Sequence, residues 1–467
     1  MTFTSSTFLP LLAVSLCLYY VFARNKSIQN LLLIAASLVF YGYGHIHYLG
    51  ILGGISLFTF CMGIFIQQVK HKIVPIIGIS VIVLFFVLIK YSGMFYDLFH
   101  FTQPSELSNL NLLLPVGLSF YSFTSIGYLA DVYSKRIQAC NNPLQFFAYS
   151  TFFPQLLSGP ICFADKQLPQ FNTNRKFNLE NIKEAIPYLV WGLFKKVVIA
   201  NTLQKPISYI FSTQSEANHT TLIIGLVIYS IQIYADFSGY SDMAYGIGRL
   251  FGIQLPINFN MPYFANNIAD YWKKWHSSLS TWFGRYIYIP LGGNRVNLFI
   301  QVKNVLIIFL VSGLWHGADL KFVLWGLLNG LFYAAYLIQK EVSIKTKLAS
   351  GLHFVKSNLI ISGPLFTFIL VCLFRVYFRA DSIQNANEYL QHLFTNSTMA
   401  IPPFGLKYLL IASLFIGFEW LQRNQPYPLT NQFSTKSIQW AYYILAIGFI
   451  TYGFQQPQTT EHIYFKF

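Results

Sequence analysis

Two of the ten histidines stand where an imidazole ring could carry chemistry. His316 interrupts an apolar run in Val311-Ser-Gly-Leu-Trp-His-Gly-Ala318, and His276 lies in the Trp- and Ser-rich segment Tyr271–Trp282. A charged side chain inside a bilayer costs on the order of 2.5–3.5 kcal/mol, so an ionisable residue there usually faces an interior cavity. A neutral imidazole can take a proton from an attacking hydroxyl and return it to a leaving group. Such a ring suits acyl transfer, and His316 and His276 are the candidates for it.

The distance of His316 from the nearest upstream charge gives its depth. If Lys303 marks the cytoplasmic boundary, His316 lies roughly 20 Å along a helix, past the middle of a hydrocarbon core about 30 Å thick. Gly313 and Gly317 flank the histidine and are expected to leave backbone space for a substrate. The spacing also fits a second interpretation, in which His276 and His316 are packed side chains whose ring nitrogens bond to neighbouring helices.

Acidic residues in apolar segments are a second group of candidates. Asp236 and Asp242 lie in Tyr234-Ala-Asp-Phe-Ser-Gly-Tyr-Ser-Asp242 and could orient a histidine or hold a cation. We expect them instead to pair with local basic groups such as Arg249, as buried carboxylates in membranes tend to do.

Five further residues are candidates for substrate-binding or supporting roles. Asn294 and Arg295 end a segment with a Pro–Gly turn, and Arg295 could bind a phosphate. The same segment could equally be an anchor at the membrane interface, because it is rich in aromatic residues. Trp275 and Trp315 each directly precede a candidate histidine, and Ser312 lies one helical turn before His316.

The composition places these residues in a membrane protein. Apolar residues make up 54% of the 467 residues and charged residues only 10%, whereas soluble domains carry about 25% charged residues. At about 20 residues per spanning helix, the apolar content allows roughly ten to thirteen helices. The net charge of +15 comes from small basic groups between apolar runs, which is typical of cytoplasmic loops and does not indicate nucleic-acid binding. The sequence therefore predicts an all-α, polytopic integral membrane protein.

Apolar runs alternate with loops of different charge in the first third of the chain. Basic residues follow the first, third and fifth runs and are absent from the second and fourth connections, so the amino terminus is expected outside the cytoplasm. Residues 146–163 are interrupted by Pro154 and Gly159 and predict a bent or re-entrant segment. The predicted spans are residues 7–23, 28–44, 48–69, 73–90, 112–130, 185–203, 221–236, 304–318, 322–339, 358–378, 405–422 and 438–454.

Several chemistries find no support in the motifs. The chain contains no phosphate-binding G-x-x-x-x-G-K-[ST] loop, no H-E-x-x-H and no paired C-x-x-C, and its five cysteines are scattered. No metal site and no bound cofactor are therefore expected. A transporter or channel that uses Asp236, Asp242 and the histidines as an ion path remains an alternative from another class, and so does a non-catalytic membrane scaffold.

The motifs around these residues resemble those of the membrane-bound O-acyltransferase family, and most closely its bacterial alginate and peptidoglycan O-acetyltransferase branch. They occur in family order and span most of the chain. One departure is Gly284-Arg285, where relatives often have Arg-Asp. The matching segments are Leu114–Phe123, Phe153–Pro160, Tyr234–Asp242, Trp275–Trp282, Tyr288–Arg295, Ser312–Gly317 and the aromatic tail Ile463–Phe467.

The resemblance implies one acyltransferase domain over residues 1–467, with peripheral helices at about 1–110, a motif-bearing core at about 111–340 and C-terminal helices at about 341–467. It implies a helical core around a central funnel, with His316 at its narrow point as the base and His276 as a second positioning or proton-handling group. The acyl donor would be acetyl-CoA or another acyl thioester on the cytoplasmic side of the cell (inner) membrane.

The expected acceptor is a hydroxyl of an envelope or exopolysaccharide across the membrane, reached directly or through an extracytoplasmic acetyltransferase partner. A D-alanyl transferase of the teichoic-acid type, supplied by a carrier-protein thioester, is the alternative within the enzyme class.

Overall fold

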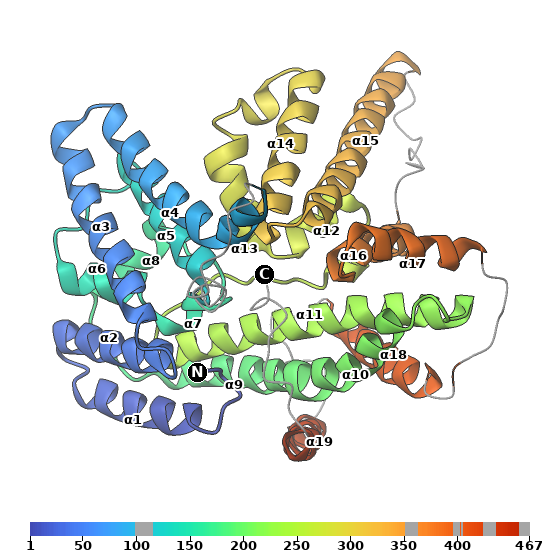
Figure 1. Ribbon diagram of the computed structural model, residues 1–467. Coiled ribbons are helices and arrows are strands. Elements are labelled where there is room, and N and C mark those ends of the chain that lie inside the picture. Colours follow the sequence, from blue (N-terminus) through green and yellow to red (C-terminus); the bar gives the residue numbers. More distant parts are fainter. Residues whose placement is uncertain (99–114, 351–362, 396–401, 403–404, 424–435, 457–467) are drawn as a thin grey trace. The chain divides into compact units, whose positions relative to one another are not determined.

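The fold is all-α, as the composition predicts. The computed structural model describes residues 1–98, 115–350, 363–395, 402, 405–423 and 436–456, and their regular elements are helices with no β-strand among them (Figure 1). Each predicted apolar span contains a helix. The aromatic tail Ile463–Phe467 lies outside the described residues.

The chain divides into two compact units. Unit 1 contains residues 1–193 and 239–257, and unit 2 contains residues 194–238 and the described residues between 258 and 463. The long helix α11, His219–Leu250, contributes its first part to unit 2 and its last part to unit 1. The single acyltransferase domain and the central funnel that the resemblance implies remain predictions.

Unit 1 packs its helices around aromatic and aliphatic side chains. Asn25 begins α2 by accepting hydrogen bonds from the backbone N–H groups of Ser27 and Ile28, which satisfies donors that a helix start leaves open. The unit comprises α1 (Phe8–Val21), α2 (Lys26–Gly42), α3 (Tyr48–Val69), α4 (Ile73–Leu98), α5 (Leu118–Tyr133), α6 (Pro143–Ser150), α7 (Phe153–Leu156), α8 (Ala164–Gln167), a 3₁₀ turn (Leu168–Asn172), α9 (Leu179–Leu193) and the end of α11.

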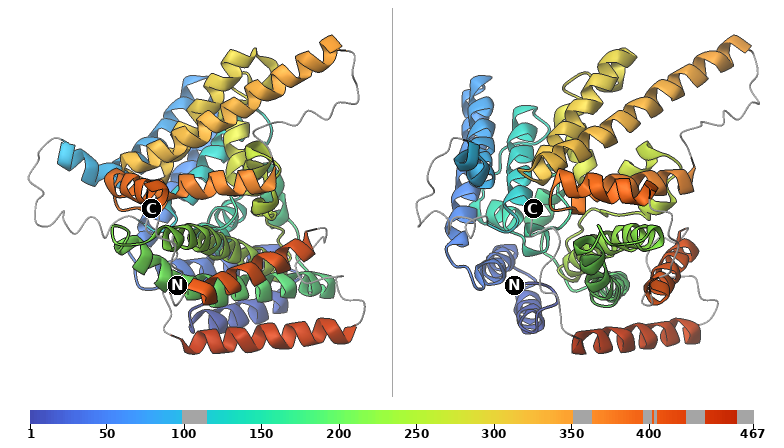
Figure 2. Two further views of the ribbon diagram at one scale, coloured as in Figure 1. Left: turned by 90° about the vertical axis from the view of Figure 1, so that its right-hand side faces the viewer. Right: turned by 45° about the vertical axis from the view of Figure 1, so that its right-hand side comes forward.

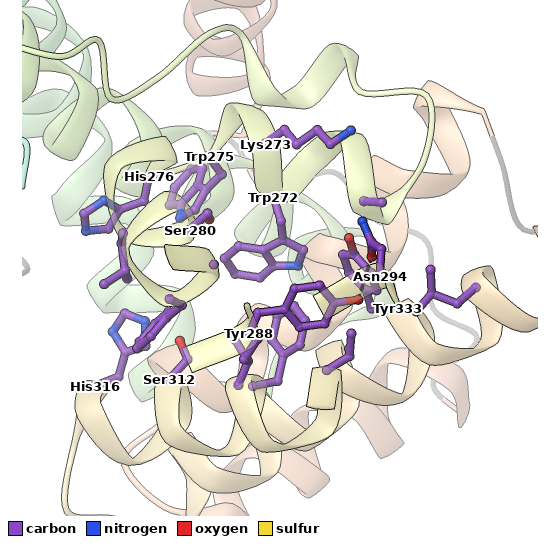
Figure 3. Close-up of a pocket in the computed structure, with 18 residues that line it drawn as sticks. Trp272, Lys273, Trp275, His276, Ser280, Tyr288, Asn294, Ser312, His316 and Tyr333 are labelled. Atoms are coloured by element: carbon purple, nitrogen blue, oxygen red, sulfur yellow. Dashed lines mark hydrogen bonds between the residues drawn. The ribbon is translucent and has the colours of Figure 1, made fainter. Parts of the chain in front are cut away.

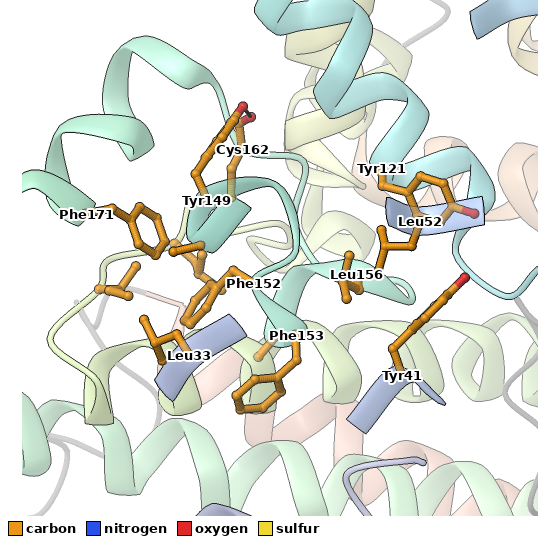
Figure 4. Close-up of a cluster of buried hydrophobic side chains, with 14 of the residues drawn as sticks. Leu33, Tyr41, Leu52, Tyr121, Tyr149, Phe152, Phe153, Leu156, Cys162 and Phe171 are labelled. Carbon is orange, nitrogen blue, oxygen red and sulfur yellow. Dashed lines mark hydrogen bonds between the residues drawn. The ribbon is translucent and has the colours of Figure 1, made fainter. Parts of the chain in front are cut away.

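The interrupted segment 146–163 belongs to the core of unit 1. It forms the end of α6, the one-turn helix α7 and an irregular stretch, so the predicted break is confirmed. Its apolar side chains are buried among residues of α2, α3 and α5 (Figure 4). The cluster includes Leu33, Tyr41, Leu52, Tyr121, Phe152, Phe153 and Leu156.

Unit 2 carries the candidate histidines. Its elements are the π-helix η3 (Phe194–Ala200), α10 (Asn201–Ser212), the first part of α11, η4 (Pro262–Phe264), α12 (Ile268–Lys274), α13 (Ser277–Phe283), the π-helix η5 (Gly284–Tyr288), η6 (Gly293–Arg295), α14 (Leu298–His316), α15 (Leu320–Ser350), α16 (Pro364–Arg379), α17 (Ile383–Thr395), α18 (Gly405–Gln422) and α19 (Lys436–Gln455).

Helices α14 and α15 lie side by side in unit 2 (Figures 1 and 2). Glycines permit this close approach, because a Cβ atom on Gly326 would lie 2.3 Å from the carbonyl oxygen of Phe309, and one on Gly313 would lie 2.4 Å from that of Phe322. A Cβ on Gly317 would meet the Phe322 ring. The prediction that Gly313 and Gly317 leave room for a substrate is therefore wrong, because α15 occupies that space.

Five helices in the described part of the chain are long and apolar enough to cross a membrane by length and composition. They are α3, residues 73–92 of α4, α11, α14 and residues 320–344 of α15, while α1 and α2 are shorter apolar helices. Many large apolar side chains on these helices are exposed, as a lipid-facing surface requires. The inside and outside assignment of the loops remains a prediction.

Candidate active site

A cavity of about 250 Å³ in unit 2 brings the two candidate histidines together (Figure 3). Residues of α12, α13, η5, η6, α14 and α15 line it, most of them apolar or aromatic. Among the residues that the sequence analysis selected, the lining includes His276, His316, Trp275, Ser312 and Asn294. The cavity also includes Trp272, Lys273, Ser280, Tyr288 and Tyr333, which the sequence analysis did not select.

His316 is the last residue of α14 and is held by aromatic rings. Its imidazole is 4% exposed, and its centroid lies 4.5 Å from that of Trp315, 4.9 Å from that of Trp325 and 5.1 Å from that of Phe378. The helix ends here because Gly317 adopts an extended conformation at the C-cap. Three helices, α14, α15 and α16, therefore fix the position of this ring.

His276 occupies a strained backbone position between α12 and α13. Its φ of 45° and ψ of 51° place a non-glycine residue in the left-handed region, a conformation that is costly and concentrates at functional sites. The ring is 1% exposed, its Nδ1 lies 3.0 Å from Oδ1 of Asn258, and it makes an edge contact with Phe237. Burial lowers the pKa of His276 to about 3, which keeps the ring neutral at physiological pH. His276 lies outside the five candidate spans.

Trp315 links the two histidines. Its ring centroid lies 6.2 Å from that of His276 and 4.5 Å from that of His316. Ser280 and Ser312 line the same cavity and add hydroxyl groups to it (Figure 3). The site thus combines two buried imidazoles with the hydroxyls of two serines, which suits proton transfer between small hydroxyl- and carbonyl-bearing groups.

The candidate carboxylate Asp236 lies outside the lining of the cavity that contains the histidines. It forms a buried ion pair with Lys196 of η3 at 2.7 Å, and it is absent from the cavity lining. The neighbouring Lys195 pairs with Glu419 of α18 at 3.0 Å. The predicted pairing of Asp236 with a basic group is confirmed in kind, with Lys196 as the partner, whereas Arg249 pairs with Glu184 within unit 1.

Asn294 and Arg295 differ in their relation to the cavity. Asn294 lines the cavity and accepts a hydrogen bond from the hydroxyl of Tyr288 at 2.8 Å. Arg295 lies in η6 next to it but is not part of the lining. A phosphate contact by Arg295 remains a prediction. Within the described part of the chain, no three His, Cys, Asp or Glu side chains form a group that could hold a metal ion.

Arg375 of α16 is a functional candidate that the sequence analysis missed. Its guanidinium is 4% exposed and lies 4.2 Å from the ring centroid of Trp275, the cavity residue next to His276. It donates hydrogen bonds to the backbone oxygen of Ser230 and to the hydroxyls of Tyr263 and Tyr271. An arginine inside an apolar run is itself a signal, because such residues face the protein interior. Lys195 and Lys196 also lie in an apolar run, so the same reasoning could have selected them.

Comparisons with known proteins identify the family of the chain. A sequence model of MBOAT, the membrane-bound O-acyltransferase family, matches residues 33–373, a range that includes both histidines. Peptidoglycan O-acetyltransferase of Helicobacter pylori is 34% identical over 414 residues, which cover 82% of this chain and 77% of that protein.

Two other kinds of relative extend the comparison. Probable alginate O-acetylase AlgI of Pseudomonas aeruginosa is 33% identical over 450 residues, covering 91% of this chain and 83% of that protein. Teichoic acid D-alanyltransferase of Streptococcus thermophilus is 26% identical over 277 residues, covering 55% of this chain and 65% of that protein. Both the family match and the extent of the first two alignments favour an enzyme over the transporter and scaffold alternatives. The chain therefore belongs to the membrane-bound O-acyltransferase family, and it is a multi-pass membrane O-acyltransferase.

Proposed function

We propose that this chain transfers an acetyl group from an acyl thioester, with acetyl-CoA as the donor, to a hydroxyl of an envelope or exopolysaccharide. The observation that carries the proposal is the shared cavity, in which His276, His316 and two serine hydroxyls surround a volume of about 250 Å³. The relatives whose alignments cover most of this chain are named for O-acetyl transfer to peptidoglycan and alginate. Their names support the acetyl group and the polysaccharide acceptor.

His316 is the proposed base of the reaction. One of its ring nitrogens takes the proton of the acceptor hydroxyl while the hydroxyl oxygen attacks the thioester carbonyl carbon. The carbon–sulfur bond then breaks, and the proton passes to the sulfur, so that an ester and a free thiol are the products. The rings of Trp325 and Phe378 hold the imidazole of His316 in place for this step.

The charge of the cavity favours an acetyl group over a D-alanyl group. Among the described residues that line the cavity, none is acidic, and Lys273 is the charged one. A D-alanyl group carries an ammonium ion, which would have no carboxylate partner in this lining and would be repelled by the lysine. An acetyl group is neutral, and the apolar and aromatic lining suits it.

The membrane sets the direction of transfer in this proposal. The thioester donor is taken from the cytoplasmic side of the cell (inner) membrane, and the acetyl group is delivered on the other side, directly or through an extracytoplasmic partner. Lys273 lines the cavity, and its side chain extends away from the two histidines (Figure 3). Its positive charge supports an anionic donor such as a coenzyme A thioester.

The test uses the purified full-length chain in lipid nanodiscs with acetyl-CoA and a soluble polysaccharide acceptor. We expect release of coenzyme A thiol that depends on the acceptor, together with transfer of labelled acetyl to it. A D-alanyl carrier-protein thioester supplied in parallel should give no transfer. Transfer of D-alanine in place of acetate, or solute flux without thiol release, would overturn the proposal.

A further inference from the structure

Asn258 is a buried polar residue whose side chain forms a hydrogen bond with His276. It is 2% exposed and lies on the irregular segment that precedes α12. Its side-chain oxygen Oδ1 lies 3.0 Å from Nδ1 of His276, 2.9 Å from Oγ of Ser278 and 3.3 Å from the backbone nitrogen of Ser278. Three donor positions therefore converge on one amide oxygen.

The backbone nitrogen of Ser278 decides the orientation of the Asn258 amide. A backbone N–H can only donate, so the Asn258 atom that faces it must be the oxygen and not the NH₂ group. The same oxygen faces Nδ1 of His276, and two acceptors cannot share a hydrogen bond. Nδ1 must therefore carry the proton, and the lone pair of the neutral ring lies on Nε2.

The backbone around Asn258 supports the same arrangement. Its carbonyl oxygen accepts a hydrogen bond from the backbone N–H of Ser277 at 2.9 Å, and the N–H of Asn260 donates to the carbonyl of Lys274 at 3.0 Å. These two bonds enclose the left-handed residue His276 on both sides. The strained conformation of His276 is thus held by the segment that also sets the tautomer of its ring.

We propose that Asn258 is a positioning residue that fixes His276 in the Nδ1–H tautomer, so that His276 acts in the cavity as a hydrogen-bond acceptor and not as a donor. This inference rests on the proposed function for the identity of its partner, which is a second hydroxyl of the polysaccharide acceptor. In that role His276 accepts a hydrogen bond through Nε2 from this second hydroxyl, while His316 takes the proton of the attacking hydroxyl. A ring whose conjugate acid is strongly disfavoured by burial is a weak base but still a good acceptor.

The tautomer is measured directly by ¹⁵N NMR on the full-length chain with ¹⁵N-labelled histidine, in nanodiscs and without substrate. The His276 resonances are assigned by their loss in His276→Gln. We expect a protonated Nδ1 and an unprotonated Nε2 in the wild type and a protonated Nδ1 in Asn258→Asp, which keeps an oxygen at the same place. In Asn258→Leu this preference should be lost. A wild-type ring protonated at Nε2 would overturn the proposal.

Kinetics of acetyl-CoA thiol release test the positioning role. Asn258→Leu should lower kcat by about tenfold or more while leaving KM for acetyl-CoA unchanged, because donor binding does not use the lost hydrogen bond. Asn329→Leu is the matched control, since Asn329 is also buried and its side-chain nitrogen donates a hydrogen bond to the backbone oxygen of Trp325. Wild-type kcat in a folded Asn258→Leu protein would contradict the inference.

The two readouts separate this inference from the proposed function. If Asn258→Leu does not reach the membrane, the wild-type and Asn258→Asp spectra still decide the tautomer. If the wild-type protein transfers no acetyl group, the proposed function fails. The tautomer of His276 in the resting protein is still decided by the NMR spectra.

Discussion

At the scale of single residues, the two histidines are held by different kinds of contact. His276 bonds through Nδ1 to Asn258, whereas His316 is surrounded by the rings of Trp315, Trp325 and Phe378. A hydrogen bond fixes which ring nitrogen carries the proton, and edge-on aromatic packing fixes the plane of the ring. We propose a division of labour in which His276 binds a second hydroxyl of the acceptor and His316 takes the proton of the attacking hydroxyl.

Arg375 provides the first prediction at this scale. Arg375→Lys should destabilise the protein by about 2 kcal/mol, because a lysine cannot bond to Ser230, Tyr263 and Tyr271 together while it lies against Trp275. The thiol-release rate should also fall, since Trp275 lines the cavity next to His276. The free energy of unfolding in detergent measures the first effect and the acetyl-CoA assay the second.

The matched control for Arg375 is an exposed arginine with the same kind of contact. Arg423 lies 3.9 Å from the ring centroid of Trp420 at the end of α18, where solvent competes for the cation. Arg423→Lys should therefore cost well under about 1 kcal/mol. Equal losses of unfolding free energy in the two variants would show that burial of Arg375 adds nothing to stability.

At the scale of elements, the contact between α14 and α15 positions His316. Gly326→Ala should separate the two helices and reduce activity, because the new Cβ atom would lie 2.3 Å from the backbone oxygen of Phe309. Forcing such an atom into a packed contact costs about 1–3 kcal/mol. The melting temperature and the thiol-release rate of the purified variant check the prediction.

Gly417→Ala on α18 is the control for this substitution. Among the described residues, and apart from the backbone of α18 itself, no atom lies within 4 Å of a Cβ built at Gly417. Alanine should therefore leave stability unchanged or raise it slightly through its better helix propensity. If Gly326→Ala were as stable and as active as Gly417→Ala, the close helix contact would not be needed to hold the site.

The buried ion pairs of η3 give the second prediction at this scale. Lys196→Met should destabilise the protein by about 3–5 kcal/mol, because the buried carboxylate of Asp236 would lose this ion pair. Combining it with Asp236→Leu should restore most of the loss, since two apolar side chains need no partner. Unfolding free energies of the single and double variants measure this coupling.

An exposed pair shows what burial contributes. Lys183 and Glu180 form an ion pair at 2.7 Å with both side chains largely exposed, so Lys183→Met should have little effect on stability. If the double variant of Lys196 and Asp236 were no more stable than the Lys196 single variant, this explanation of the ion pair would be contradicted.

At the scale of the whole molecule, composition and hydropathy were enough to predict the fold class. Low charge content and regularly spaced apolar runs predicted helices in the places where they lie, because a chain in lipid must satisfy its backbone hydrogen bonds within helices. The short helices α12 and α13 were not predicted, since their mixed aromatic and polar sequence has no clear helical period.

The candidate site was predictable only in part. His316 could be selected because ionisable residues are costly inside apolar segments, and His276 because it lies in a motif that resembles that of the family. The structure places both at one cavity. Asn258 could not, because its role depends on a hydrogen bond across a fold that no local pattern reveals. The error over Gly313 and Gly317 has the same origin, since the sequence does not show that Phe322 packs against them.

The central claim is that His316 serves as the base of acetyl transfer to an envelope polysaccharide. The most direct measurement is the base-labile O-acetate on envelope polysaccharide from cells with the wild-type protein, His316→Ala or no copy of the protein. We expect His316→Ala at normal membrane level to lose acetate as fully as the deletion does, since a positioned base typically contributes 10²–10⁴-fold. Wild-type acetate in cells with the inserted His316→Ala protein would contradict the claim.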